Sequence, residues 1–303
     1  MKKPIKNLPA SVRDRLVRMA KDRGLLFQQA LSYYAIERLL YRLAASEYSE
    51  TFVLKGGLIF IAHRLPLRRP TRDIDLHAQG DNSVEGLEKI IRAVCNQPVE
   101  PDGMQFATGS LKGERINPGA DVAEVRMTLR AYLEVAVIPM QIDVSFANVI
   151  TPAITKANYP SMLGMPTLEI RTYPFETAIA EKLHAMVFLG SVNDQLRDFY
   201  DIWLLSTECT FDGEVLYHAV VATFRQRKTP IPQEPPVAFS DGFAEQKEAQ
   251  WLALLRTFEP GASRVPDFKG ILGQLRQFLN PILLAAAKNS PVQQQWSPSK
   301  GWH

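Results

Sequence analysis

Residues 51–77 constrain the fold more than any other stretch of this chain, because they carry the sequence TFVLKGGLIFIAHRLPLRRPTRDIDLH. Residues 51–54 are β-formers, and Lys55, Gly56 and Gly57 end that run. The apolar segment 58–62 predicts a short helix, and prolines interrupt the arginine-rich segment that follows. Residues 73–76 predict a second strand. The stretch therefore predicts a strand, glycine turn, helix, loop and strand in succession.

The second strand carries two carboxylates with strand spacing. Because successive side chains of a strand point to opposite faces, Asp73 and Asp75 share one face while Ile74 and Leu76 share the other. Their Cα atoms are separated by roughly 7 Å. Two such carboxylates can converge on Mg²⁺, which proteins hold through one or two carboxylates plus substrate phosphates. The alternative is an exposed strand with two solvated aspartates beside an ordinary glycine turn.

The glycine turn complements this pair, because paired glycines let backbone N–H groups approach a phosphate closely. A third carboxylate, Asp143, stands on the polar face of a predicted strand at residues 139–146, with Gln141 and Ser145. Beside a metal pair it could complete the metal shell or deprotonate an attacking hydroxyl. The alternative is an exposed strand aspartate.

The periodicity of the chain predicts an α/β part followed by a helical part. Helices are expected at residues 9–24, with Ser11 as N-cap and Gly24 as stop, and at 26–46 and 84–95. Residues 159–173 look like the link to a helical lobe. A last helix is expected at 268–287, followed by a polar, mobile tail. We therefore expect two lobes, residues 1–160 and 161–303.

The helical lobe contains a second group of charged residues. Lys182 lies at the edge of an apolar helix stripe, where an unpaired ammonium is costly to bury. A phosphate or a carboxylate would serve as its partner, and a structural lysine whose ammonium reaches solvent is the alternative. Arg197, Asp198 and Asp201 follow at helical spacing and would neighbour one another. The alternative is that these residues form an ordinary intrahelical salt bridge.

Charge distribution is more informative than net charge. The 35 basic and 32 acidic residues give a net charge of only +3, which does not argue for nucleic acid. Residues 2–23 nevertheless hold eight basic side chains against two acidic ones, and Arg64, Arg68, Arg69 and Arg72 crowd one loop. Such clusters are typical of polyanion sites, although a solvated helix face also explains the first.

Cysteine content and hydropathy address the compartment. Cys95 and Cys209 have no metal-site spacing, and two cysteines in 303 residues favour a reducing compartment. No apolar stretch is long enough to span a bilayer, and no apolar segment follows the basic N-terminus as in a secretory signal. We expect a cytoplasmic protein without a membrane partner.

These motifs, in this order, resemble the AbiEii/AbiGii toxin-like nucleotidyltransferases, which include the MenT toxins and are relatives of the DNA polymerase beta-like nucleotidyltransferases. The similarity covers roughly residues 12–205. It is carried by Lys55-Gly56-Gly57, Asp73-x-Asp75 and Asp143, and in the second half by Glu181-Lys182-Leu183-His184-Ala185 and Arg197-Asp198-x-x-Asp201. One position departs from the pattern: Leu58 stands where many members carry a serine or threonine, so a hydroxyl contact to phosphates is missing.

The resemblance implies an α+β, bilobed fold, with a nucleotidyltransferase-type mixed sheet and a C-terminal helical lobe. It implies Asp73 and Asp75 as metal ligands, with Asp143 beside them, and contacts from Lys55 and Lys182 to the triphosphate. Asp201, with Arg197 and Asp198 nearby, would line the site from the helical lobe. Family members transfer a nucleotide from an NTP, in the MenT case to the 3′ end of tRNA, and often act as toxins with a cognate antitoxin.

The sequence thus predicts a Mg²⁺-dependent nucleotidyltransferase that acts on RNA, with tRNA as the expected acceptor, as the toxin of a toxin–antitoxin pair. Two alternatives stay open. One is a non-catalytic RNA- or protein-binding module on the same fold, and the other is nucleotidyl transfer to a protein or small molecule. The sequence does not choose the nucleotide.

Overall fold

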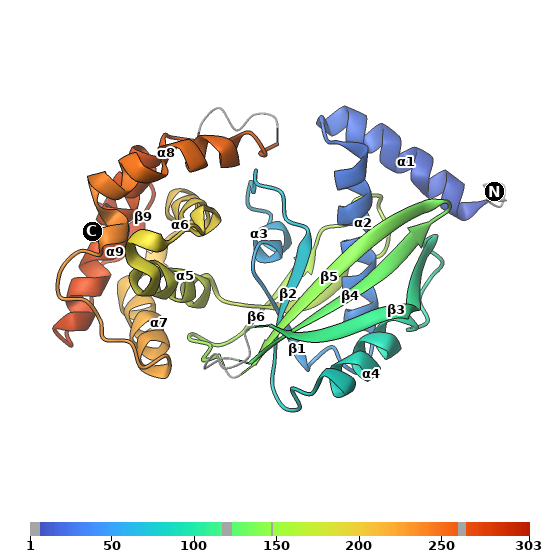
Figure 1. Ribbon diagram of the computed structural model, residues 1–303, viewed down its shortest axis with the longest axis horizontal. Coiled ribbons are helices and arrows are strands. Elements are labelled where there is room, and N and C mark those ends of the chain that lie inside the picture. Colours follow the sequence, from blue (N-terminus) through green and yellow to red (C-terminus); the bar gives the residue numbers. More distant parts are fainter. Residues whose placement is uncertain (1–6, 117–122, 147, 260–264) are drawn as a thin grey trace. The chain divides into compact units, whose positions relative to one another are not determined.

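The computed structural model describes residues 7–116, 123–146, 148–259 and 265–303 (Figure 1). The chain divides into two compact units. Unit 1 comprises Met1–Pro66, Pro70–Ala147 and Lys156–Thr172, and unit 2 comprises Leu67–Arg69, Asn148–Thr155 and Tyr173–His303. The chain therefore passes from one unit to the other several times, and each unit is described by itself.

Unit 1 is built on a seven-stranded mixed sheet with the strand order β3-β4-β5-β2-β1-β7-β6 in the described residues. The strands are β1 (Phe52–Lys55), β2 (Asp73–Ala78), β3 (Met104–Ile116), β4 (Glu124–Leu133), β5 (Ala136–Phe146), β6 (Thr155–Tyr159) and β7 (Leu168–Thr172). β2 lies parallel to β5 and antiparallel to β1, whereas β3, β4 and β5 form an antiparallel meander. The strand that carries the paired aspartates is therefore central.

The helices of unit 1 cover the apolar side of this sheet. They are α1 (Leu8–Arg23), α2 (Phe27–Ala45), α3 (Leu58–Ala62) and α4 (Val84–Cys95). α2 packs against β5, β7 and α4, and α4 packs on β3. The predicted helices are confirmed, but Asn7 rather than Ser11 caps α1, because its Oδ1 accepts a hydrogen bond from the N–H of Ala10 at 3.1 Å. Gly24 ends α1 in the left-handed conformation, as expected.

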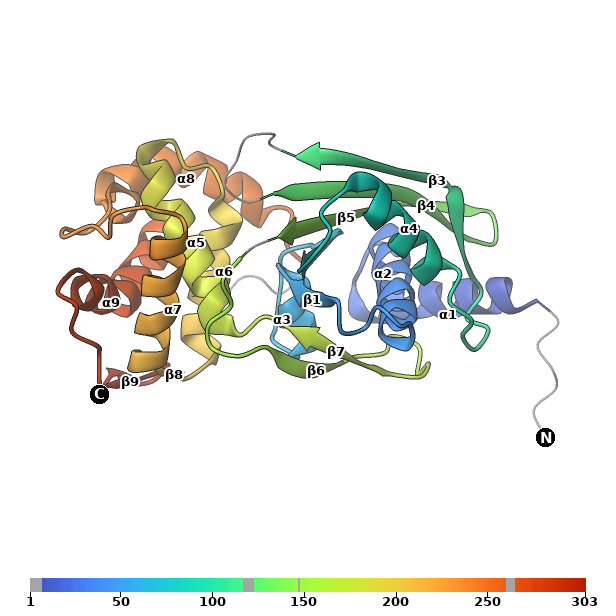
Figure 2. The ribbon, with the colours of Figure 1, turned by 90° about the horizontal axis from the view of Figure 1, so that it is seen from below.

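Unit 2 is mainly helical. Its helices are α5 (Phe175–Leu189), α6 (Leu196–Glu208), α7 (Gly213–Gln226), α8 (Asp241–Leu255) and α9 (Phe268–Ala287), with short 3₁₀ turns η1 (Gly190–Val192) and η2 (Val237–Phe239). α9 packs against α6, α7 and α8, and α5 packs against α7 (Figure 2). Apolar stripes such as Phe199, Phe243 and Phe268 meet at these helix contacts.

Two sequence expectations differ from the structure. Instead of a mobile tail, β9 (Gln295–Ser297) and β10 (Gly301–Trp302) form a small sheet with β8 (Phe211–Asp212). Two tryptophans hold this otherwise polar segment in place. Trp296 is buried and donates a hydrogen bond to the carbonyl of Ser206, and Trp302 donates one to the carbonyl of Phe278. A lobe boundary was expected at residue 160, but β7 pairs with β1, so unit 1 extends to Thr172.

Candidate functional site

The polar face of β2 presents Asp73 and Asp75 as the strand period predicts. Both aspartates are partly exposed, while Ile74 and Leu76 between and after them are buried on the opposite face at 1% and 2% exposure. The apolar pair anchors the strand in the core of unit 1. The two carboxylates are consequently held on one face by a rigid central strand.

Gly56 meets two requirements of the turn beside Asp75, a left-handed backbone and the absence of a side chain. Its φ of +64° lies in the left-handed region, which side chains with a Cβ rarely adopt. A Cβ built on Gly56 would lie 2.0 Å from the Oδ2 atom of Asp75. The Asp75 carboxylate therefore rests against the bare backbone of the turn. Gly57 has helical φ and ψ and stands at the start of α3.

Strand register sets four charged residues opposite one another across the sheet. Lys55 on β1 pairs in register with Asp75, Asp75 with Asp143 on β5, and Asp143 with Arg126 on β4. The ammonium of Lys55 donates to the hydroxyl of Ser145 at 3.1 Å. A row of four charges therefore crosses the polar face, with the two carboxylates next to each other between two cations.

Asp143 is held by its neighbours on the same face. Arg126 donates to both of its carboxylate oxygens, at 2.9 and 2.8 Å, and the amide of Gln141 donates to Oδ2 at 3.0 Å. The hydrogen bonds to Asp143 and the nearby charge of Asp73 raise the pKa of Arg126. Within the described residues, no three His, Cys, Asp or Glu side chains gather as a metal site. The expected role of Asp143 as third ligand stays a prediction.

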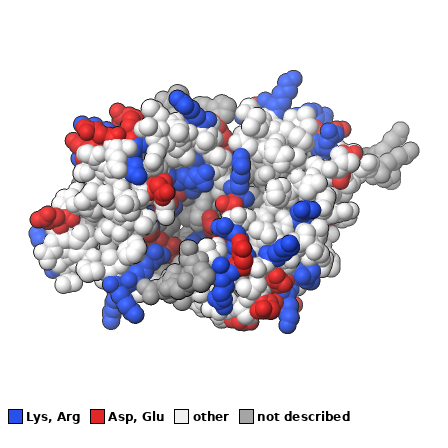
Figure 3. All heavy atoms as spheres, viewed as in Figure 1, with Lys and Arg blue, Asp and Glu red and all other residues white. Residues whose placement is uncertain are grey.

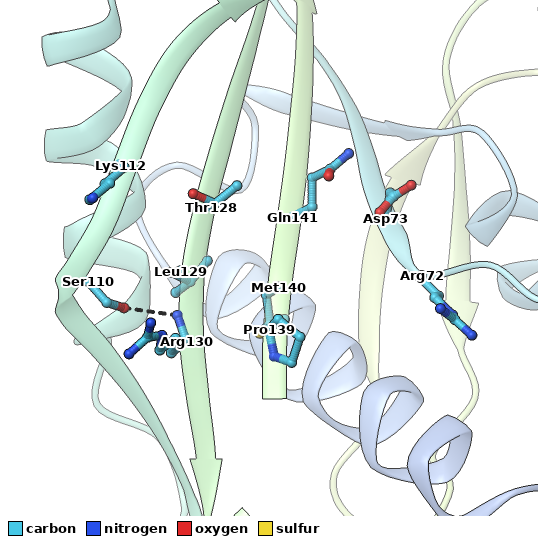
Figure 4. Close-up of a pocket in the computed structure, with 10 residues that line it drawn as sticks. All are labelled: Arg72, Asp73, Ser110, Lys112, Thr128, Leu129, Arg130, Pro139, Met140 and Gln141. Atoms are coloured by element: carbon cyan, nitrogen blue, oxygen red, sulfur yellow. Dashed lines mark hydrogen bonds between the residues drawn. The ribbon is translucent and has the colours of Figure 1, made fainter. Parts of the chain in front are cut away.

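A groove opens on the same sheet face beside Asp73. It has a volume of about 640 Å³ and is lined from β2, β5, β4 and β3. Asp73, Gln141 and Thr128 lie side by side across it, with Lys112 beyond them on β3 and Arg72 beside Asp73 (Figure 4). Asp73 of the carboxylate pair thus lies at one end of an open groove.

Unit 2 contains the predicted cluster of Lys182, Asp198 and Asp201, and Arg69 joins it unexpectedly. Asp201 is fully buried, and Arg69 donates to both of its oxygens, at 2.6 and 2.7 Å. Lys182 contacts Asp201 at 2.9 Å and also pairs with Asp198. One buried carboxylate is thus shared by two cations, while Arg197 on the same helix is exposed.

The charges of this cluster stabilise one another. Burial opposes the charge of Lys182, but the carboxylates of Asp198 and Asp201 more than offset it and raise the pKa of Lys182. Burial likewise opposes ionisation of Asp201, yet Arg69 and Lys182 together lower its pKa. The cluster is therefore an ionised network at neutral pH.

His184, two residues after Lys182 on α5, contacts neighbouring side chains of unit 2 through its two ring nitrogens. Its Nε2 lies 2.8 Å from the hydroxyl of Thr229, and its Nδ1 lies 3.4 Å from a guanidinium nitrogen of Arg227. Since a guanidinium only donates, Nδ1 accepts and the ring is neutral with its proton on Nε2. Burial, with a contribution from Arg227, lowers the pKa of His184 to about 4.

The basic clusters are only partly surface features. Arg69 is buried in its pair with Asp201 and is not available to an RNA phosphate, which corrects its expected place in a basic track. Lys2, Lys3 and Lys6 lie outside the described residues. Figure 3 shows basic and acidic side chains interspersed over the displayed surface, without a large field of one sign.

Comparison with known proteins identifies the family. Residues 38–274 match the family model described as nucleotidyl transferase AbiEii toxin, type IV toxin–antitoxin system. The chain belongs to the AbiEii family. It is accordingly a nucleotidyltransferase of a toxin family, and the match includes both the Asp73–Asp75 strand and the Lys182–Asp201 cluster.

Two solved structures from Helicobacter pylori are similar to this AbiEii protein. JHP933 shares 13% sequence identity over 86% of this chain and 93% of its own, with a TM-score of 0.49. A candidate nucleotidyltransferase from H. pylori also shares 13% identity, over 88% of this chain and 97% of its own, with a TM-score of 0.47. No curated protein matches the chain. None of the described helices is long and apolar enough to cross a bilayer.

The structure of this AbiEii protein also explains the departure at Leu58 and shows what the sequence analysis missed. Leu58 begins α3 and is fully buried, so it serves the core rather than the phosphate side of the turn. Arg126 and the pairing of Arg69 with Asp201 were not foreseen. Alternation along β4 could have placed Arg126 on the polar face, but only strand register could give it Asp143 as its partner.

Proposed function

We propose that this AbiEii enzyme transfers a nucleotide from an NTP to the 3′ end of an RNA, with tRNA as acceptor and Mg²⁺ as cofactor. The observation that carries the proposal is the position of Asp73 and Asp75 on one polar strand face, with Asp75 resting against the backbone of Gly56. This arrangement sets a carboxylate pair beside a turn that a phosphate can approach. The family match supports the reaction class.

The donor set fits the proposed metal. Carboxylate oxygens are the ligands that Mg²⁺ prefers, and one or two carboxylates plus substrate phosphates are its usual protein site. Asp73 and Asp75 would hold the ion, with Asp143 next in register. A bound Mg²⁺ would supply charge stabilisation at the reacting phosphate.

The remaining residues have roles that follow from their contacts. Lys55 and the backbone N–H groups at Gly56 and Gly57 would bind the phosphates of the NTP. Lys182 would be a further triphosphate contact, with phosphate oxygens replacing the partly exposed Asp198 as its partner. Asp201 and Arg69 would hold that lysine in place.

Asp143 is the proposed group that orients or deprotonates the acceptor hydroxyl. Arg126 and Gln141 fix the direction of its carboxylate, so the group is already oriented before a substrate arrives. A general base must lie within hydrogen-bond reach of the proton that it accepts. The position of Asp143 in register beside Asp75 supports that role, because an acceptor hydroxyl near the proposed ion would lie close to it.

In the cell, we place this reaction in a toxin whose effect a cognate antitoxin protein counters. Support for this part comes from the family alone. Induced expression should arrest growth, and an Asp73→Asn, Asp75→Asn double variant should not. Coexpression of the antitoxin gene should restore growth without lowering the amount of toxin.

The direct test incubates the purified protein with each α-labelled NTP and total RNA, with Mg²⁺ or with EDTA. We expect Mg²⁺-dependent label in RNA of tRNA size, at a 3′ end shown by sequencing. Label in protein would instead establish transfer to a protein acceptor. An absence of transfer from all four nucleotides would contradict the proposed activity and favour a non-catalytic binding module.

A further inference from the structure

We infer that the groove over β2, β5, β4 and β3 binds the phosphates of the single-stranded 3′-terminal nucleotides of the acceptor RNA, and does so without reading their bases. This inference rests on the proposed function and names the place of its second substrate. It concerns unit 1 alone, because all ten described residues that line the groove belong to that unit.

The position of the groove follows from the geometry of phosphoryl transfer. The attacking and leaving oxygens lie roughly in line on opposite sides of the reacting phosphorus. The glycine turn and Lys55, which would bind the leaving phosphates, lie on the β1 side of β2. The groove lies on the opposite side of the same strand, over β5, β4 and β3. An acceptor in the groove therefore approaches from the side that in-line attack requires.

The charges of the groove suit a phosphate backbone. Three exposed cations line it, namely Arg72, Lys112 and Arg130, against the single carboxylate Asp73. None of the three forms an ion pair within the described part of the chain. Asp73 itself is the proposed metal ligand at the end of the groove. The three cations are thus available to phosphates that lead toward Asp73.

The shape of β3 brings one of these cations to the groove. The register shifts between Ala107 and Lys112, as at a β-bulge or a similar irregularity, and such features commonly re-aim side chains near functional sites. The hydroxyl of Ser110 donates to the carbonyl of Ala107 at 2.7 Å and accepts from the N–H of Arg130 at 2.9 Å. This side chain links β3 to β4 at the register shift, after which Lys112 lies opposite Thr128.

The side chains that line the groove also indicate that it does not distinguish between RNA bases. None of its ten described residues is aromatic, so the base stacking that typical single-strand binders use is missing there. Its volume of about 640 Å³ is within the usual range for ligand pockets, yet it is open along the sheet face. Contacts to phosphates position a nucleic acid without specifying it. Any choice among RNAs must then come from other surfaces.

The test compares a groove variant with a charge-matched control. Lys112→Ala with Arg130→Ala removes two groove cations, whereas Lys89→Ala with Arg225→Ala removes one lysine and one arginine from exposed helix positions elsewhere. The probes are a 5′-fluorescent RNA hairpin with a single-stranded 3′ tail and the same hairpin with a blunt end. Affinity is measured by anisotropy over a range of salt, and NTP affinity by calorimetry.

We expect the groove variant to bind the tailed RNA about tenfold more weakly than wild type, with little change for the blunt RNA. The salt slope for the tailed RNA should become shallower by about 1.4, or roughly 0.7 for each lost contact to a single strand. Changing the tail sequence should leave this loss unchanged, and NTP affinity should equal that of wild type.

The inference is overturned if both double variants lose RNA affinity equally, or if the groove variant loses NTP affinity in place of RNA affinity. It is also overturned if the loss of RNA affinity depends on the bases of the tail, or if the wild-type protein binds tailed and blunt RNA equally well. Because all substituted side chains are exposed, melting temperatures should stay close to wild type, and the single variants Lys112→Gln and Arg130→Gln provide a second set. A wild type that binds the tail through the groove but transfers no nucleotide would contradict the proposed function and leave the groove assignment intact.

Discussion

The Oδ2 atom of Asp75 lies where a side chain at Gly56 would begin, 2.0 Å from the position of a Cβ on that residue. The left-handed φ of Gly56 and the absence of a side chain are therefore two separate requirements at one position. The turn after β1 and the carboxylate on β2 form one structural feature, although 18 residues of sequence lie between them.

The first prediction concerns Gly56→Ala. A Cβ there must displace the Asp75 carboxylate, so transfer activity should fall at least 100-fold. Gly164→Ala is the control, because Gly164 has nearly the same φ, +65°, but has no atom within 4 Å of the built Cβ. Both variants should lose about 1–2 kcal/mol of folding stability from the left-handed conformation. Similar activity losses in the two variants would mean that strain, rather than displacement of Asp75, is responsible.

The second prediction concerns the carboxylate pair. Asp73→Asn and Asp75→Asn should each lower NTP transfer at least 100-fold at saturating Mg²⁺, because each removes a charge that would hold the ion. The amide is close in size to the carboxylate, so the unfolding midpoint should change little. Asp22→Asn, an exposed position on α1, serves as the control and should retain full activity. Wild-type rates in either site variant would reject the metal assignment.

The third prediction concerns the buried network of unit 2. Asp201→Ala leaves Arg69 and Lys182 without their shared carboxylate, and should lower the free energy of unfolding by about 3–5 kcal/mol in urea titrations. Lys182→Met should cost less, because Arg69 still donates to both oxygens of Asp201. The same lysine variant should weaken NTP binding. Unchanged NTP affinity together with a large stability loss would make Lys182 a purely structural residue.

The fourth prediction is a pH dependence of stability. His184 has a folded pKa of about 4 against an ordinary value of 6.5, so the unfolded chain binds its proton first as the pH falls. The contribution of His184 to stability should therefore be complete above about pH 6.5 and decline from there to about pH 4. His184→Gln should flatten this part of the wild-type stability profile.

The comparison for that profile is His218→Gln, which removes an exposed histidine from α7. Its stability profile should follow that of wild type between pH 6.5 and 4. Parallel profiles for wild type and His184→Gln would show that protonation of His184 is not linked to unfolding. Denaturant titrations at closely spaced pH values give both comparisons.

Local patterns in the sequence were sufficient for several elements of the site. The period of a strand is two residues, so Asp73 and Asp75 had to share a face once Ile74 and Leu76 were buried. Helix periodicity similarly placed Lys182 at the edge of an inward face. Apolar patterning also predicted the helix at residues 84–95, which is α4 in the structure. Each of these depends on neighbours within a few positions along the chain.

The tertiary structure alone decided which side chains became partners. Arg69 and Asp201 are 132 positions apart, and Arg126 meets Asp143 only because β4 and β5 pair in one register. A shift of one residue would have turned Arg126 to the opposite face. The segment after α9 also has a partner that is distant in sequence, because the indole of the buried Trp296 donates to the carbonyl of Ser206. The sequence by itself determined which faces are polar, whereas long-range packing determined which charges meet on them.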